Sequence, residues 1–315
     1  MRALAAMTLA ALMGFGSAVN CANAEEYFYW PEFGTFAQHN NWGSEFIKVT
    51  QANQLGATGA GVKVAVLDEG LADYEPSLRN KVVAYKNFLP GQSIRAEHGT
   101  MAASLISADY NPAVGIQGVA PDAQLIVAKV CHRSSCEWEA IRKAVNWAVA
   151  EGAQVISMSF SGNIDAYMHA TIRAAIDKGV VIVGAMGNWG CNPYGYWGLN
   201  VSCVQGRITE STQATYPIAG LIAAGASDQR GARVSSINWS SSFGPNMDLL
   251  APGIDISAYD AYAASNGFGG TSASTPYIAG AAALLFSINP NFTPADIQAI
   301  LQSTATKAPG TAQSS

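Results

Sequence analysis

Five short apolar runs limit the folds open to this chain more than any other feature of its sequence. A nearly continuous apolar run of this length is typical of a strand buried on both faces, as in a parallel sheet. Two stretches with apolar residues three and four apart, at 137–151 and 167–178, lie between such runs and predict helices. The alternation predicts βαβ units and an α/β fold, with a doubly wound, mostly parallel central sheet covered by helices on both faces. The runs occupy residues 62–67, 124–130, 155–159, 180–185 and 221–226.

The composition fits a large and well-buried globular body. Charged residues make up 12% of the 315, which is about half the usual share, and 49% are hydrophobic. A chain of this kind can bury enough apolar surface to fold, so disorder is excluded. The net charge is −5 and Lys and Arg form no cluster, so nucleic acid is not expected as a partner.

The first residues have the pattern of a secretory signal peptide. Arg2 precedes an apolar run at 3–13, and Ala22-Asn23-Ala24 matches a cleavage site. The run is too short to cross a bilayer, so we expect no membrane insertion of the mature form. This predicts an exported protein, extracellular or periplasmic, with a signal peptide at 1–24, a leading segment at 25–61, a main domain at 62–303 and a polar tail at 304–315.

Four cysteines remain after removal of that segment, and an even number in an exported chain predicts two disulfides. Four cysteines allow three pairings, of which we favour the local one, Cys131 with Cys136 and Cys191 with Cys203. A metal site that uses Cys131, His132 and Cys136 is the alternative. Their spacing does not match a zinc hairpin, and no second Cys/His pair is close in sequence, so we predict no metal there.

The residues around Ser272 predict a loop that leads into a buried helix. Gly269 and Gly270 permit a tight turn, and small residues followed by an apolar run continue from Thr271. On its own this pattern indicates a capped core helix, because Ser and Thr are ordinary N-caps. A serine in the first turn also has an exposed hydroxyl and an N–H outside the helix ladder, which suits a nucleophile.

Three further polar residues follow predicted strands or begin predicted helices. Asp68 closes the first apolar run, His98 begins a helix of small residues, and Asn188 lies in a Gly-flanked loop after another run. Each one alone has a structural explanation as a cap or a turn residue. Together with Ser272 they supply the hydroxyl, imidazole, carboxylate and amide donor that nucleophilic acyl transfer needs.

These motifs, in the order Asp, His, Ser, resemble the subtilisin-like serine peptidases (subtilases) from about residue 53 to residue 303. The resemblance implies that Asp68 orients the imidazole, His98 is the general base and acid, Ser272 attacks the scissile carbonyl, and Asn188 donates to the oxyanion. The main domain is then a peptidase domain and the chain a secreted serine endopeptidase. Polypeptides are the expected substrates, the expected state is a monomer, and the chemistry requires no cofactor.

The same resemblance assigns a substrate strand at 156–162 and a main specificity pocket. The family usually has glycine where this chain has Ser161, which should narrow the pocket and favour a medium-sized apolar side chain before the cut. Other departures are Glu69, where a small hydroxylated residue is usual, and Met101 in place of a second histidine. The predicted pocket walls are Ser159, Phe160, Ser161, Ala185 and Met186.

The sequence leaves several alternatives open. The chain could be a catalytically silent subtilase-fold binding domain, although it keeps every member of the triad. A structural calcium ion is a second open alternative, for which residues 107–117 offer Asp109 and Asn111 but no dense set of oxygen ligands. The aromatic stretch at 189–203 could extend the substrate cleft or pack on the surface. Finally, residues 25–61 are too few for an independently stable folding prodomain, so none is evident.

Overall fold

The computed structural model describes most of the chain from residue 41 onward. Cys191, Cys203 and most of the predicted signal peptide lie outside the described residues. The described residues are 41–72, 75–91, 96–112, 115–132, 135–161, 165–188, 190, 218, 220–235, 239–243, 247–260 and 265–308, together with the backbone of 16–17.

The main sheet has the strand order β13-β1-β10-β9-β8-β7-β2-β4-β3, and all pairs from β10 to β3 are parallel. The chain first adds β3 and β4 on one side of β2, and then returns to place β7, β8, β9 and β10 on its other side. This reversal confirms the predicted doubly wound sheet. These strands are β2 Lys63–Asp68, β3 Val82–Asn87, β4 Gln124–Lys129, β7 Val155–Met158, β8 Val181–Ala185, β9 Leu221–Ser227 and β10 Leu249–Pro252.

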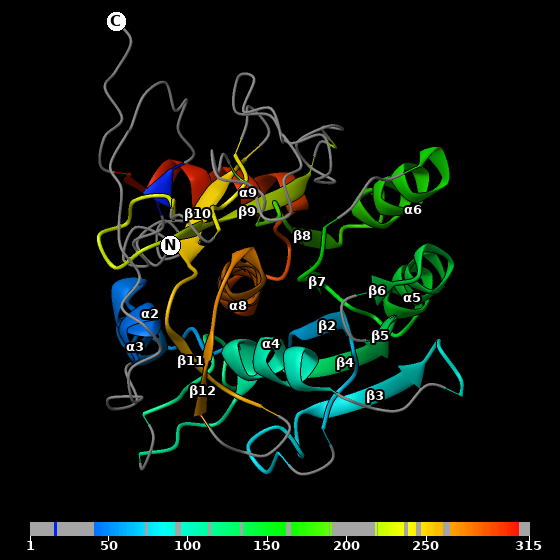
Figure 1. Ribbon diagram of the computed structural model, residues 1–315, viewed down its shortest axis with the longest axis horizontal. Coiled ribbons are helices and arrows are strands. Elements are labelled where there is room, and N and C mark those ends of the chain that lie inside the picture. The colour runs from blue at the N-terminus through cyan, green and yellow to red at the C-terminus, as the bar shows by residue number, and fades with distance from the viewer. Residues whose placement is uncertain are drawn as a thin grey trace, which may run out of the picture.

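Helices cover both faces of the sheet, as Figure 1 shows. The core on one face contains apolar residues of α4 and α8, and the core on the other contains those of α5 and α6. Along β2 the side chains alternate between them, with Val64 and Val66 in the first core and Ala65 and Leu67 in the second. The helices are α4 Glu97–Ser107, α5 Trp138–Ala150, α6 Ala166–Asp177, α8 Thr271–Ile288 and α9 Pro294–Thr304.

The leading segment packs on the main body through two short helices, α2 Trp42–Phe46 and α3 Val49–Gln54. The indole N–H of Trp42 donates to the Ile254 carbonyl at 3.1 Å, and Ala52 is fully buried. At the sheet's other end, β1 Gly16–Ser17 pairs with β10 and with β13 Thr306–Lys307. β1 falls inside the predicted signal peptide, whose removal stays a prediction.

The local disulfide Cys131–Cys136 is present, as predicted. It joins the two strands of a short hairpin, β5 Cys131–His132 and β6 Ser135–Cys136, in which the two cysteines are directly paired. The predicted Cys191–Cys203 pair lies outside the described residues. Within the described part of the chain, no helix combines the length and apolar character that crossing a membrane demands.

The sheet brings the predicted catalytic residues to one edge. Asp68 is the last residue of β2, Ser159 directly follows β7, and Asn188 comes shortly after β8. β2 and β7 are neighbours on opposite sides of the chain reversal, and ligands of doubly wound sheets bind at such a switch point, beyond the carboxyl ends of the strands. A second small sheet, β11 Ile256–Tyr259 with β12 Ser265–Phe268, leads into α8.

Candidate active site

Asp68 and His98 form a hydrogen-bonded pair. The Nδ1 atom of His98 lies 2.9 Å from Oδ1 and 3.0 Å from Oδ2 of Asp68. Asp68 is buried, and the backbone N–H of Glu69 donates to its Oδ1 at 2.7 Å, so the carboxylate is held in place. The Phe268 ring also contacts the His98 imidazole in an edge-to-face arrangement, with the ring centroids 5.2 Å apart. The Asp68 contact leaves Nε2 as the ring nitrogen for proton transfer.

Gly99 allows this pair to form because α4 passes very close to the turn after β2. A Cβ atom at position 99 would lie 2.1 Å from the Gly70 carbonyl oxygen and 3.2 Å from the Asp68 Cβ. Neither neighbour is the end of a flexible side chain. Any residue larger than glycine would therefore push α4, and His98 with it, away from Asp68.

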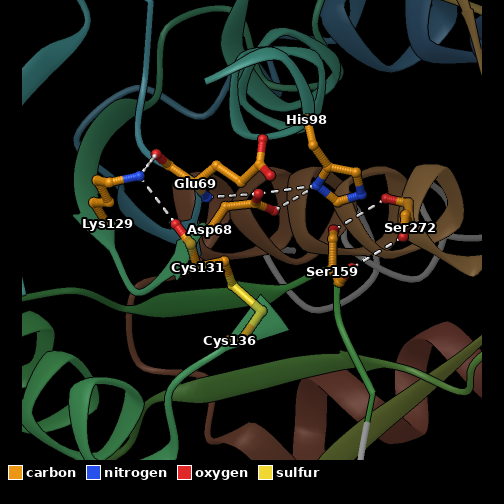
Figure 2. Close-up of a disulfide and its surroundings, with 8 residues drawn as sticks. All are labelled: Asp68, Glu69, His98, Lys129, Cys131, Cys136, Ser159 and Ser272. Carbon is orange, nitrogen blue, oxygen red and sulfur yellow. Dashed lines mark hydrogen bonds and ion pairs between the residues drawn. A yellow bond between two sulfur atoms is a disulfide. The ribbon is translucent and has the colours of Figure 1, made fainter. Parts of the chain in front are cut away.

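Ser272 is the second residue of α8, as the Gly-rich lead-in predicted. Gly270 precedes the helix with a φ of 82°, a conformation that glycine adopts without strain. No acceptor for the Ser272 backbone N–H is found among the described residues, as expected in a first helical turn. Figure 2 shows the Ser272 side chain directed toward the side of the His98 ring that faces away from Asp68.

Ser159 and Ser272 are joined by two reciprocal hydrogen bonds. The Ser272 hydroxyl donates to the Ser159 carbonyl at 2.9 Å, and the Ser159 hydroxyl donates to the Ser272 carbonyl at 3.0 Å. The second bond has a local cause, because Pro276 follows Ser272 by four positions and has no N–H for that carbonyl. Ser159 replaces the missing helical donor and ties the end of β7 to the nucleophile.

The orientation of the Asn188 amide is fixed by the start of α8. Its Oδ1 accepts from the Thr271 backbone N–H at 2.8 Å and lies 3.2 Å from the Thr271 hydroxyl, which itself accepts from the Gly187 N–H at 3.0 Å. The Nδ2 group is consequently the donor that Asn188 can offer to an oxyanion. A Cβ at Gly270 would lie 2.7 Å from this Nδ2, so the Asn188 side chain and the helix start are in close contact.

The charges around His98 favour its protonated form. Burial alone would lower the pKa of His98, but the charge and hydrogen bond of Asp68, with a smaller contribution from Glu69, raise that pKa above the ordinary 6.5. Burial and the nearby Asp68 charge raise the pKa of the Glu69 carboxyl. Lys129 is fully buried, and burial lowers its pKa.

The predicted pocket residues lie at the ends of β7 and β8, which pair side by side: Ala185 is the last residue of β8, and the others follow the two strands. Ser161 is partly exposed, and a Cβ at Gly187, whose φ is +97°, would lie 2.9 Å from its hydroxyl. Phe160 packs against the α5–α6 core. Ala185 and Met186 are buried, and Met186 belongs to a separate cluster with Ala223 and Met247, so a wall at Met186 would have to use its backbone.

No group of three or more His, Cys, Asp or Glu able to hold a metal exists among the described residues. Asp109, considered as a calcium ligand, instead pairs with Lys81 at 2.6 Å. The Lys81 ammonium also donates to the Pro121 carbonyl at 2.6 Å. A cationic side chain therefore already neutralises Asp109, which does not suit a calcium site at this carboxylate.

A profile of the Subtilase family matches residues 59–315. The chain belongs to the subtilase family. An alkaline protease of Alkalihalobacillus alcalophilus is 35% identical over 283 residues, covering 87% of this chain and 67% of the relative. Subtilisin Savinase of Lederbergia lenta is 35% identical over 278 residues, covering 86% of this chain and 93% of the relative. The crystal structure of MycP1 without its N-terminal propeptide matches with a TM-score of 0.67 and 27% identity, covering 82% of this chain and 87% of MycP1.

Three contacts of this subtilase's site were not predicted from its sequence. They are the Ser159–Ser272 pair, the edge contact of Phe268 on His98, and the place of Glu69 beside the histidine. The Ser159–Ser272 pair did have a signal in the sequence, because Pro276 lies four residues after the nucleophile and lacks the N–H that would bond to its carbonyl. The other two depend on which elements become neighbours, and a single sequence does not reveal that directly.

Proposed function

We propose that this subtilase cleaves peptide bonds with Ser272 as nucleophile, His98 as general base and acid, and Asp68 as the carboxylate that orients His98. As a subtilase related to alkaline proteases and subtilisins, the chain is a serine endopeptidase. The observation that carries the residue assignment is the Asp68–His98 pair at 2.9 Å, with Ser272 at the first turn of α8 directed toward that imidazole (Figure 2).

In the proposed mechanism, His98 Nε2 takes the proton of the Ser272 hydroxyl as its oxygen attacks the scissile carbonyl. Asp68 stabilises the imidazolium that forms. His98 then gives the proton to the leaving amine, and an acyl-enzyme remains on Ser272. Water, activated by the same imidazole, hydrolyses this ester and restores the free hydroxyl.

The hydroxyl's resting partner has to change before attack. A hydroxyl has one proton, and that of Ser272 is donated to the Ser159 carbonyl. Ser159 lies in the segment predicted to pair with the substrate backbone, so a substrate N–H would compete for this carbonyl. Substrate binding would thereby release the hydroxyl toward His98.

The oxyanion of the tetrahedral intermediate would be stabilised by two donors, the Ser272 backbone N–H and the Asn188 Nδ2 group. Thr271 supports the second donor, because its N–H holds the Asn188 oxygen and thereby keeps the amide nitrogen as donor. Donors that are already oriented cost no reorganisation when charge develops.

For specificity we propose a pocket limited by Ser161, which lies against Gly187. A glycine at position 161 would leave more depth, so the chain should prefer a medium-sized apolar residue before the cut. Ser159, Phe160, Ala185 and Met186 complete the proposed walls, Met186 through its backbone.

The protein is proposed to be exported after removal of residues 1–24, and to act as a monomer with its peptidase domain at 62–303. The signal-peptide pattern supports export, and a monomer suffices because one chain supplies all four catalytic groups. Mass spectrometry of the mature N-terminus tests the first point, with cleavage after Ala24 expected. A mature chain that retains Arg2 would contradict it.

Incubation of the purified protein with an unfolded protein substrate, followed by mass spectrometry of the products, tests the proposed function. We expect internal cleavage by the wild type and none by Ser272→Ala. A wild type that leaves the substrate intact, or a Ser272→Ala variant with full biological effect, would favour the alternative of a silent binding domain.

A further inference from the structure

Glu69 stands next to the catalytic carboxylate in sequence, yet its own carboxylate has no part in the triad. The side chain is buried, with 8% of its surface exposed. A buried carboxylate is costly unless nearby groups stabilise its charge, so the contacts of Glu69 indicate why it is retained.

The first contact is with the start of α4. Helix α4 begins at Glu97, and the capping position before it is Ala96, which has no side-chain acceptor for the first-turn N–H groups. The Glu69 carboxylate reaches this helix start (Figure 2), close enough to the His98 backbone N–H for that donor to lower the carboxyl's pKa against the raising effect of burial. The helix dipole also favours a negative charge at this end.

The second contact fixes the Glu69 backbone. Lys129, at the end of β4, is fully buried and donates to the Glu69 carbonyl at 3.1 Å and to the Cys131 carbonyl at 3.0 Å. The Glu69 N–H donates to Asp68 Oδ1 at 2.7 Å. The Glu69 backbone is thus held by β4 and by the catalytic aspartate. Figure 2 shows the Glu69 side chain extending toward His98, with Lys129 on the opposite side of its backbone.

We propose that Glu69 is a positioning residue that acts through His98: it holds the histidine backbone at the start of α4 and adds a second negative charge beside the imidazole. This inference rests on the proposed role of His98 as general base. Glu69 does not touch the substrate, and it acts on the protonation and placement of His98.

Among the described residues, few other charged groups face this site. Asp68 of β2 is hydrogen-bonded to His98, and Lys129 of β4 is the nearby cation. From β3, the hydroxyl of Tyr85 lies close to Gly70, the residue after Glu69. β12 contributes the uncharged Phe268. Glu97 is on α4 itself and is not among the groups that shift the pKa of His98.

Removal of the Glu69 charge should destabilise the imidazolium, and the sign of the effect follows from this. The Glu69 charge contributes to raising the pKa of His98, so Glu69→Gln lowers that pKa. The acid limb of the kcat/KM profile then moves to lower pH. At the alkaline plateau kcat/KM falls by about three- to tenfold, because the transition state contains the imidazolium.

The test compares pH profiles of kcat/KM for the wild type, Glu69→Gln, Glu69→Asp and Glu97→Gln. Glu97→Gln is the matched control, since it removes the same charge one residue before His98 and should leave the limb unchanged. Glu69→Asp keeps the charge and should restore the wild-type limb at least in part. A merely structural Glu69 would alter thermal stability or the plateau without moving the limb.

A second measurement does not depend on turnover. In the Ser272→Ala background, NMR titration of the His98 ring proton reports its protonation with and without Glu69→Gln. An unchanged titration or acid limb in Glu69→Gln overturns the proposal, as does the same result in Glu69→Ser if the glutamine variant does not fold. A wild type that cleaves no peptide would instead contradict the proposed function, and the NMR titration would still decide the role of Glu69.

Discussion

A methyl group at position 99 would fall inside the contact between α4 and the turn after β2. In Gly99→Ala the new Cβ would start 2.1 Å from the Gly70 carbonyl oxygen. Carbon–oxygen contacts settle near 3.3 Å, so α4 has to move by roughly 1 Å. His98 moves with it, and its 2.9 Å contact with Asp68 then exceeds the range of a useful hydrogen bond.

The expected result is a fall in kcat of about a hundredfold, as for other misplacements of about 1 Å, and at most about 10⁴-fold if the imidazole loses its correct tautomer. Overpacking should also cost about 1–3 kcal/mol of stability. The assay is hydrolysis of a chromogenic peptide at saturating substrate, with circular dichroism to establish that the variant is folded.

Gly280→Ala is the matched control for this experiment. Its new Cβ would lie 2.6 Å from the Val119 Cβ, in a part of α8 two turns beyond the nucleophile. It should lose stability to a similar extent while keeping kcat. A folded Gly99→Ala enzyme with wild-type kcat would refute the reasoning that close packing of α4 sets the distance between His98 and Asp68.

Four further predictions concern the site and its surroundings. Ser159→Ala leaves the Ser272 carbonyl without its donor and should lower the free energy of unfolding by about 1–3 kcal/mol, measured by urea denaturation; an unchanged midpoint would contradict the compensation for Pro276. Asn188→Ala should lower kcat about 10²–10³-fold, the loss established in subtilisin, with little change in KM in steady-state kinetics; a change confined to KM would argue against oxyanion binding. Because the pKa of His98 is raised above 6.5, kcat/KM should rise with pH only as the pH passes that raised pKa. The stability that His98 contributes has the opposite trend: it is complete below pH 6.5 and is lost as the pH rises through the raised pKa. Comparing the pH dependence of the free energy of unfolding between the wild type and His98→Ala checks this sign. A contribution of His98 that grows as the pH rises would contradict it. Reduction of Cys131–Cys136, which are five residues apart, should cost about 2 kcal/mol, measured by thermal unfolding with and without a reductant against a Cys131→Ser/Cys136→Ser variant that should not respond.

Much of the fold could be predicted from the sequence because burial leaves a periodic record. The run at 62–67 became β2, and the pattern at 137–151 became α5, each within one residue at either end. The convergence of Asp68 with Asn188 also followed from the sequence, because carboxyl ends of parallel strands share one edge. The local disulfide was predictable for a similar reason, since its two cysteines are close in the chain.

The remaining contacts depend on which distant elements become neighbours. The Glu69 carboxylate approaches the start of α4, where Ala96 offers no side-chain cap, about thirty residues further along the chain. Ser159 supplies the donor that Pro276 lacks, and it can do so only because the end of β7 packs beside the start of α8. Such contacts leave no periodic signal, so the sequence shows that Glu69 departs from the family pattern but does not show the purpose of the departure.

Labelling with an active-site phosphonofluoridate, followed by mass spectrometry of the digested protein, tests the central claim most directly. One adduct per chain is expected, located on Ser272, and it should form far more slowly in His98→Ala. Cleavage of peptides by a protein that carries no adduct at Ser272, or equally fast labelling of the His98→Ala variant, would contradict the assignment of Ser272 as a nucleophile activated by His98.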